Sequence, residues 1–217
     1  MGQVASLTGF SQQNYPDWSA RGDELPLEAG LAARQLFNTK RANCAEAVFK
    51  AVHQLVGGPL PPMVSALLTP MGSGVAITGD ICGAMVAGVM AMGLVYGRNE
   101  PEAGTLEQHR GDLWKTYALY NQLPHRFREK FGTTNCWELT EPRVYGTKEC
   151  RCCCEVYVQE SAAMAMELLL EAKREGMDFT FNKSLLDQNS KRTGLTAEEL
   201  IEYKRAGKHF PRPENNK

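Results

Sequence analysis

The chain has almost no excess charge of either sign and no long apolar run. Its 24 basic and 25 acidic residues leave a formal net charge of -1, and no basic motif of a nucleic-acid-binding fold is present. The longest uncharged apolar run, Ile81 to Tyr96, is shorter than the about 20 residues that a membrane helix needs. These absences argue against a nucleic-acid partner and against a membrane span.

An export signal is also missing from the opening residues. Met1 to Phe10 lack the basic and apolar regions of a signal peptide, so we expect a cytoplasmic protein. Disulfide frameworks are rare in that compartment, and the odd number of cysteines, seven, cannot pair completely. Seven cysteines in such a chain indicate metal binding or redox chemistry.

Strand signals are nearly absent, whereas apolar residues recur at three- and four-residue spacing. The pattern predicts an all-α protein, a compact helical bundle with extended N- and C-terminal arms. We expect an N-terminal arm (1–24), a helical redox domain (25–176) and a C-terminal arm (177–217) with one short helix. Thr196 and Glu199 form a capping box for that helix. Pro124 is expected to bend or end the helix that begins near residue 106.

Local context links the isolated cysteines. Residues 43–46 and 135–138 share the pattern Asn-Cys-x-Glu, in which Asn caps a helix and the cysteine is its first residue. Asp80 offers a similar cap that would place Cys82 in a first turn. Cys154 directly precedes a long apolar-periodic segment, so we expect it at or near the start of that helix.

A cysteine at a helix N-terminus gains from free N–H groups and from the helix dipole, which lower its pKa and favour the thiolate. Thiolates are the ligands of iron and zinc and the nucleophiles of disulfide exchange. Four of them at one point would repel one another unless a cation lay between them. The pattern therefore favours a metal ion or cluster held by Cys44, Cys82, Cys136 and Cys154.

The run of cysteines at 150–154 leaves the fourth ligand open. Adjacent cysteines cannot all ligate one small site, so Cys150, Cys152 and Cys153 are alternates to Cys154. Arg151 beside them would favour thiolates. Cys44, Cys82 and Cys136 are not part of a CxxC motif, which argues against a thioredoxin-type site.

The residues after Cys82 are unusually small. Gly83, Ala84, Ala87, Gly88 and Ala91 follow one another at helical spacing. Small side chains allow another backbone to approach closely, which is typical of a tightly packed central helix.

Several blocks of the sequence resemble a known family. They are residues 33–37 with 43–48, residues 82–88 with 91–97, Phe131-Gly132 with Cys136, and Cys154 before an alanine-rich helix. Over about residues 30–172 they are similar to the C-GCAxxG-C-C family of redox-active proteins. That family is itself similar to the iron–sulfur-binding part of split-Soret cytochrome c.

The resemblance implies one site formed by Cys44, Cys82, Cys136 and a member of the 150–154 run, where the family has one cysteine. Its distance to Tyr157-Val158 favours Cys154 as that member. The two arms exceed the usual family length.

Three functions follow from these patterns. The first is a redox or electron-transfer protein with an iron–sulfur cluster, of a type the sequence does not specify, on cysteine thiolates at helix N-termini. The alternatives are a metal-free thiol–disulfide enzyme or sensor using Cys150–Cys154, and a structural zinc site in an interaction module. The redox partner is not identified. The arms and small-residue helix faces are compatible with a homodimer.

Overall fold

The computed structural model describes residues 17–39, 41–58, 60–61, 63–98, 100, 102, 104–182 and 184–206. Within these ranges the chain folds into helices, with one isolated β-bridge between Ile81 and Asn135. The predicted all-α class is confirmed. No helix among the described residues is both long and apolar enough to cross a membrane.

The chain forms ten α-helices and two 3-10 helices (η) within the described residues. In order they are η2 (Trp18–Glu24), α1 (Leu25–Asn38), α2 (Cys44–Val56), α3 (Met63–Ala66), η3 (Thr69–Met71), α4 (Gly72–Val75), α5 (Gly83–Tyr96), α6 (Leu106–Phe131), α7 (Cys136–Thr140), α8 (Lys148–Glu175), α9 (Ser184–Thr193) and α10 (Ala197–Arg205).

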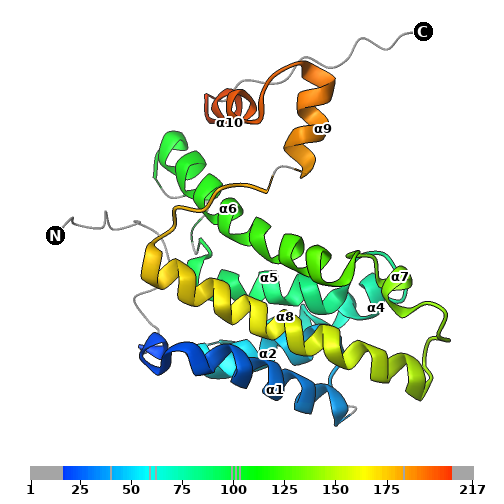
Figure 1. Cartoon of the computed structure of the whole chain (residues 1–217). Coiled ribbons are helices and arrows are strands. Elements are labelled where there is room, and N and C mark those ends of the chain that lie inside the picture. The colour runs from blue at the N-terminus through cyan, green and yellow to red at the C-terminus, as the bar shows by residue number, and fades with distance from the viewer. Residues whose placement is uncertain are drawn as a thin grey trace, which may run out of the picture.

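Helix α8 is the centre of the bundle. It packs against α1, α2, α5 and α6, while α2 also packs against α1 and α5 (Figure 1). The core between these helices contains fully buried large side chains, among them Tyr96, Met92, Phe127 and Leu169. Burial of this apolar surface is the main force that holds the bundle together.

The small residues of α5 allow close helix contacts, as the sequence predicted. A Cβ added to Gly88 would lie 2.9 Å from Leu123 Cδ1 in α6 and 3.0 Å from the Ser161 carbonyl oxygen in α8. Both distances are shorter than van der Waals contact. The close packing against α6 and α8 therefore determines the position of α5 and of its first residue, Gly83.

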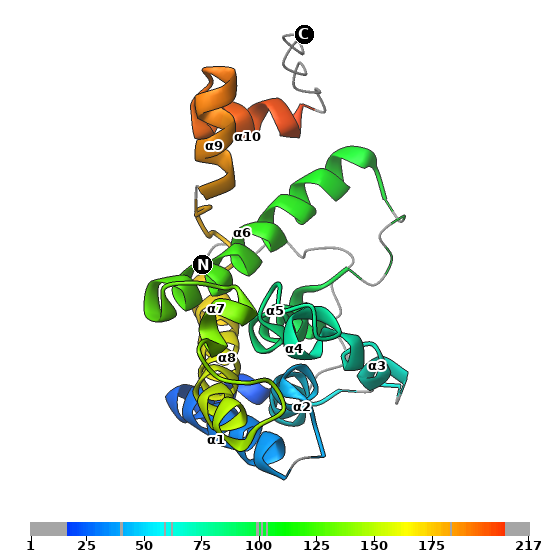
Figure 2. The same ribbon diagram turned by 90° about the vertical axis from the view of Figure 1, so that its right-hand side faces the viewer.

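Helix α6 continues through Pro124, so of the two expected effects of this proline the end of the helix is wrong. An internal proline removes one backbone hydrogen bond and costs about 3 kcal/mol. Leu123 and Phe127, on either side of it, are fully buried, and their packing outweighs that cost. The N-terminal half of α6 projects beyond the bundle (Figure 2).

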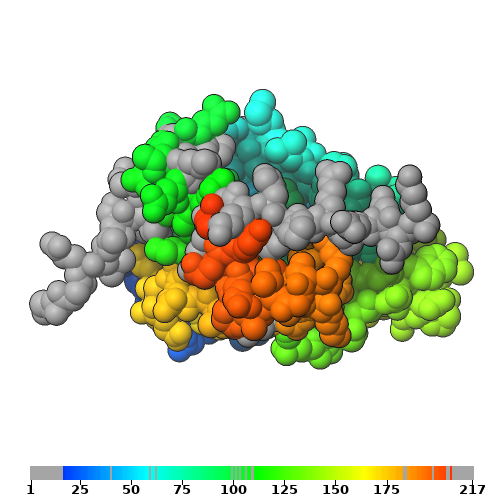
Figure 3. Space-filling view, turned by 90° about the horizontal axis from the view of Figure 1, so that it is seen from above, coloured from blue at the N-terminus to red at the C-terminus, as the bar shows by residue number. Residues whose placement is uncertain are grey.

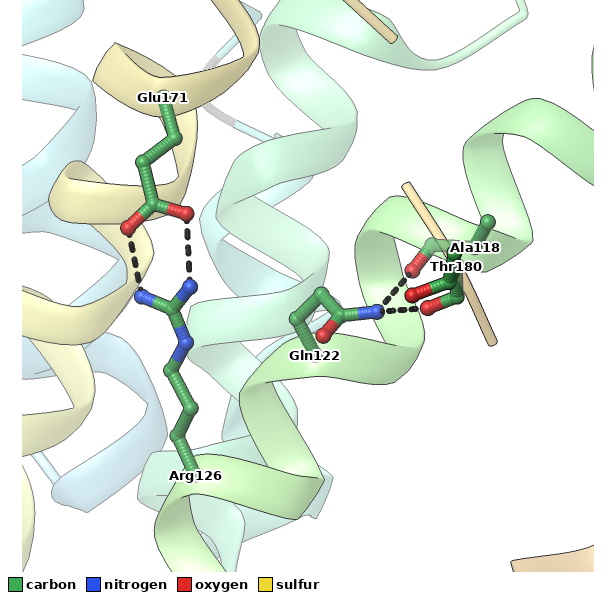
Figure 4. Close-up of polar contacts among 5 residues, drawn as sticks. All are labelled: Ala118, Gln122, Arg126, Glu171 and Thr180. Carbon is green, nitrogen blue, oxygen red and sulfur yellow. Dashed lines mark hydrogen bonds and ion pairs between the residues drawn. The ribbon is translucent and has the colours of Figure 1, made fainter. Parts of the chain in front are cut away.

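Figure 4 shows two of the polar contacts that connect α6 to its surroundings. Arg126 donates two hydrogen bonds, of 2.7 and 2.6 Å, to the two carboxylate oxygens of Glu171 in α8. Gln122 Nε2 donates to the carbonyl oxygens of Ala118, at 2.9 Å, and of Thr180, at 2.7 Å. The second contact attaches the segment that follows α8 to α6.

Both predicted arms contain more helix than expected. Residues 1–16 and 207–217 lie outside the described residues, but η2 occupies most of 17–24 and its Trp18 is buried in the core. The C-terminal arm contains two helices instead of one. The capping box of Thr196 and Glu199 forms at the start of α10. Figure 3 shows α9 and α10 lying over the bundle when it is viewed from above.

Candidate metal centre

Two of the predicted helix starts form as expected. Helix α2 begins at Cys44, where Asn43 Oδ1 accepts the Glu46 N–H at 2.9 Å and Glu46 Oε2 accepts the Asn43 N–H at 2.9 Å. Helix α7 begins at Cys136, and Asn135 caps it by accepting the Glu138 N–H at 3.0 Å. In both places the local sequence alone positions the cysteine.

The predicted Asp80 cap is wrong, because Cys82 is itself the N-cap of α5. Residues 79–82 pair through backbone hydrogen bonds with residues 134–137 instead of beginning the helix. The Cys82 N–H donates to the Thr134 carbonyl at 2.8 Å, and the Cys136 N–H donates to the Asp80 carbonyl at 2.6 Å. This pairing holds Cys82 beside Cys136.

Cys154 is not at a helix start, contrary to expectation. Helix α8 begins at Lys148, and Thr147 caps it by accepting the Cys150 N–H at 3.2 Å, so Cys154 is the seventh helical residue. The cysteine run continues the long helix toward its N-terminus because Thr147 supplies the cap. Cys154 therefore gains little from the helix terminus.

Cys154 nevertheless interacts electrostatically with two of the other predicted ligands. Burial, followed among the raising causes by the charges of Cys44 and Cys136, raises the pKa of Cys82 to about 12. Burial raises the pKa of Cys154 as well, and the charges of Cys153, Cys150, Cys44 and Cys82 contribute to that rise in this order. A Cβ added to Gly83, the residue after Cys82, would lie 3.1 Å from Cys44 Sγ. The sulfurs at the start of α2, at the N-cap of α5 and in α8 thus interact with one another.

A second grouping lies within α8. The Sγ atoms of Cys150, Cys153 and Cys154 are all within 4.8 Å of one another, a set that could hold a metal ion. These residues are three and four positions apart, so they share one face of the helix. Cys152 is exposed. The charges of Cys150 and Cys153 also contribute, after burial, to raising the pKa of Cys136 to about 11.

The expected thiolates do not form by themselves. Burial raises the pKa of Cys44 even though the backbone N–H groups of Ser73, Ala45 and Ala84 are directed at its sulfur and oppose the rise. The free energy needed to remove a thiolate from water is larger than the stabilisation that the N–H groups of a helix N-terminus provide. The buried thiols are therefore protonated at neutral pH unless a cation replaces the protons.

Arg151 was expected to favour thiolates in the cysteine run, but its guanidinium binds elsewhere. Its guanidinium stacks on the Phe37 ring, 3.9 Å from the centroid, and donates to the carbonyl oxygens of Phe37 and Ala42. The cation that acts on the cysteine run is Arg143, whose charge opposes the burial-driven rise in the pKa of Cys153. Arg151 connects α8 to α1 and to the residues before α2.

A left-handed turn before Cys82 was not predicted. Ser73, Val75, Ala76 and Ile77 have φ values of 56°, 66°, 51° and 71°, which cost about 1–2 kcal/mol for each residue with a side chain. The Ala76 N–H donates to the Pro70 carbonyl at 2.8 Å and stabilises the turn. The turn aims the Ser73 N–H at Cys44, so a strained segment contributes to the site. No pattern in the sequence indicates it beyond its glycines.

Tyr157 was not predicted to contribute to the site. Its hydroxyl donates to the Leu139 carbonyl at 2.9 Å, and its ring packs edge-on against Phe131 with 4.9 Å between the centroids. Because Tyr157 lies in α8 and Leu139 in α7, this bond connects the helix that begins at Cys136 to the helix that contains Cys154.

The raised pKa values predict how the metal-free protein responds to pH. The folded chain keeps the Cys82 proton up to a pH of about 12, whereas an ordinary cysteine loses it near 9.0. The unfolded chain therefore binds fewer protons above pH 9, and the free energy of unfolding falls as pH rises from about 9 toward 12. The expected loss is about 1.4 kcal/mol per pH unit for each such thiol.

Urea unfolding with chelator and reductant at pH values below and above 9 measures this loss. The variant Cys82→Ala should show a shallower decline than the parent chain, and Cys152→Ala the same decline. Equal slopes for the parent and Cys82→Ala would contradict the assignment.

These features define a class: a helical protein rich in free cysteines, three of which, Cys150, Cys153 and Cys154 in α8, form a group that could hold a metal ion. The chain matches, over residues 42–168, the family model described as "Putative redox-active protein (C_GCAxxG_C_C)". The match spans more than half of the chain, which therefore belongs to this redox-active family. No curated protein and no solved structure matches it.

Proposed function

We propose that the chain is an electron-transfer protein that holds an iron–sulfur cluster on Cys44, Cys82, Cys136 and Cys154. One observation carries the proposal: each of the four sulfurs interacts electrostatically with at least two of the other three, and burial raises the pKa of all four thiols. The membership in a redox-active family supports a redox cofactor over a purely structural ion.

The residues fit such a group chemically. Four cysteines are the usual ligand set of [2Fe–2S] and [4Fe–4S] clusters. Burial raises the pKa of each of the four thiols, which is the state expected of ligands whose cation is missing. The cluster would supply one-electron transfer. The chain's own groups would hold it, exclude water and tune its potential through N–H groups directed at sulfur, those of Ser73 and Ala84 among them.

The choice of Cys154 as fourth ligand rests on its neighbours. Burial raises the pKa of Cys154, and the charges of Cys44 and Cys82 contribute to the rise after those of its neighbours Cys153 and Cys150. Cys152 is exposed. Cys150 and Cys153 lie beside Cys154, with the three Sγ atoms within 4.8 Å of one another, and their charges also act on Cys136.

Anaerobic purification tests the proposal directly. The protein should absorb between about 320 and 450 nm and contain both iron and acid-labile sulfide. A colourless protein with stoichiometric zinc would show that the site is structural. A colourless, metal-free protein that also fails to take up iron and sulfide anaerobically would overturn the proposal in favour of thiol chemistry alone.

A further inference from the structure

Two thiols of α8 remain after the four proposed ligands and the exposed Cys152 are set aside. They are Cys150 and Cys153, and with the two residues between them they form a CxxC motif. This spacing does not stand out in a run of four cysteines. The structure distinguishes Cys150 and Cys153 from Cys152. Cys152 is exposed, whereas Cys150 and Cys153 share a face of the helix.

The two sulfurs are placed for bonding to each other. Their Sγ atoms lie within 4.8 Å, and Cys153 Sγ also donates a hydrogen bond of 2.9 Å to the Cys150 carbonyl oxygen. The Cys153 side chain thus folds back toward the preceding turn. Cβ atoms three residues apart on a helix are about 5–6 Å apart, and a disulfide needs about 3.5–4.5 Å, so rotation of the side chains and a small tightening of this turn suffice.

Position within α8 supports that adjustment. Cys150 is the third residue of the helix, and its N–H is bonded to the Thr147 side chain instead of a carbonyl of a preceding turn. The first turn of a helix tightens readily, because its N–H groups have no partners within the helix. Cys154 lies deeper in α8, as its seventh residue, where N–H groups already have partners within the helix.

We propose that Cys150 and Cys153 form a redox-active dithiol that closes reversibly to an intrahelical disulfide beside the metal centre. The co-reactant is a disulfide, either of a small thiol compound or of a partner protein. The Cys153 sulfur attacks one sulfur of that disulfide, forms a mixed disulfide and releases one thiol. Cys150 then attacks Cys153 Sγ and releases the second thiol, so two electrons and two protons pass to the co-reactant.

Accessibility assigns the two roles. Cys150 is 6% exposed and cannot reach an external disulfide, whereas Cys153 is only partly buried. Cys153 is therefore the attacking thiol and Cys150 the resolving thiol. The dithiol does not require the metal, so this inference stands or falls separately from the proposed cluster.

Equilibration of the full chain in glutathione buffers of graded redox ratio tests the inference. The samples are quenched with acid, alkylated and digested with trypsin, which cleaves after Arg151 and separates Cys150 from the other cysteines of the run. Oxidising buffers should produce a linked pair of peptides whose mass is lower by two hydrogen atoms. The link should persist in Cys152→Ser and Cys154→Ser and disappear in Cys153→Ser.

A second variant tests the order of attack. In Cys150→Ser the resolving thiol is missing, so Cys153 should accumulate as a mixed disulfide with one glutathione. Circular dichroism checks that each variant is folded. Absence of the linked peptides in every buffer, or their persistence in Cys153→Ser, would overturn the inference.

Measurement of iron in the same variants separates the two proposals. Cys150→Ser and Cys153→Ser should retain the iron of the parent chain. If either loses it, that cysteine is a ligand and the dithiol inference fails while the metal proposal survives. If no variant and no parent preparation binds iron, the metal proposal fails and the peptide mapping alone decides the dithiol.

Discussion

Replacing Cys44 or Cys82 with serine is expected to remove bound iron and visible absorption together. Both sulfurs lie in the buried region where α2 and α5 begin, and the two thiols interact electrostatically. A serine hydroxyl is a poor ligand for iron, and the remaining buried thiols would keep their protons. We expect iron content to fall at least about tenfold, because even residues that only support a ligand cost 10–100-fold in metal affinity.

The α8 cysteines provide a matched control in the same experiment. Cys154→Ser should lose the metal as Cys44→Ser does, whereas the exposed Cys152→Ser should keep it. Iron and sulfide analysis with anaerobic absorption spectra measures the outcome. An unchanged spectrum in Cys44→Ser would refute the shared site. Loss of the metal in Cys152→Ser would show that the α8 ligand is assigned wrongly.

Replacing Gly83 with alanine is expected to destabilise the fold by a large amount for the addition of one methyl group. The added Cβ would overlap the Met71 carbonyl oxygen, which is backbone, and would lie 3.1 Å from Cys44 Sγ. Backbone cannot turn aside as a flexible side chain can, so α5 must move away from the turn before it. We expect a loss of about 1–3 kcal/mol in the free energy of unfolding, together with a loss of iron binding.

Gly93 in the same helix is the control for this prediction. A Cβ there would meet only the Tyr120 hydroxyl, at an ordinary contact distance of 3.9 Å. Alanine also favours helix over glycine by about 0.5–1 kcal/mol, so Gly93→Ala should leave stability unchanged or raise it. Urea unfolding and iron analysis of both variants decide the matter. Equal stability of Gly83→Ala and the parent chain would contradict the close approach.

Most errors of sequence reasoning occurred where distant residues override a local signal. Pro124 was expected to end the helix if it did not bend it, but α6 is continuous, with buried side chains on either side of the proline. Asp80 has the right residue type for a cap, but its backbone pairs with residues 134–137 instead. The residues that override each signal are far away in the sequence, so the local pattern does not contain them.

The protonation state of the cysteines illustrates the same limit. A first-turn position lowers the pKa of a thiol, and this argument holds for Cys44 and Cys136 taken alone. Their pKa values are nevertheless raised, because the surrounding helices remove water from the site. Burial is a property of the assembled bundle, so a local pattern cannot report it.

The sequence by itself determined the all-α class, the starts of α2 and α7 at Cys44 and Cys136, and the redox family. These depend on hydrophobic periodicity, on capping residues within three positions, and on motif spacing. Only the tertiary structure decided that the segment of Cys82 pairs with that of Cys136, that Cys154 lies within α8, and that the sulfurs of Cys150, Cys153 and Cys154 lie within 4.8 Å of one another. The physical reason is that backbone pairing and helix packing join segments far apart in the chain, and these contacts orient each sulfur.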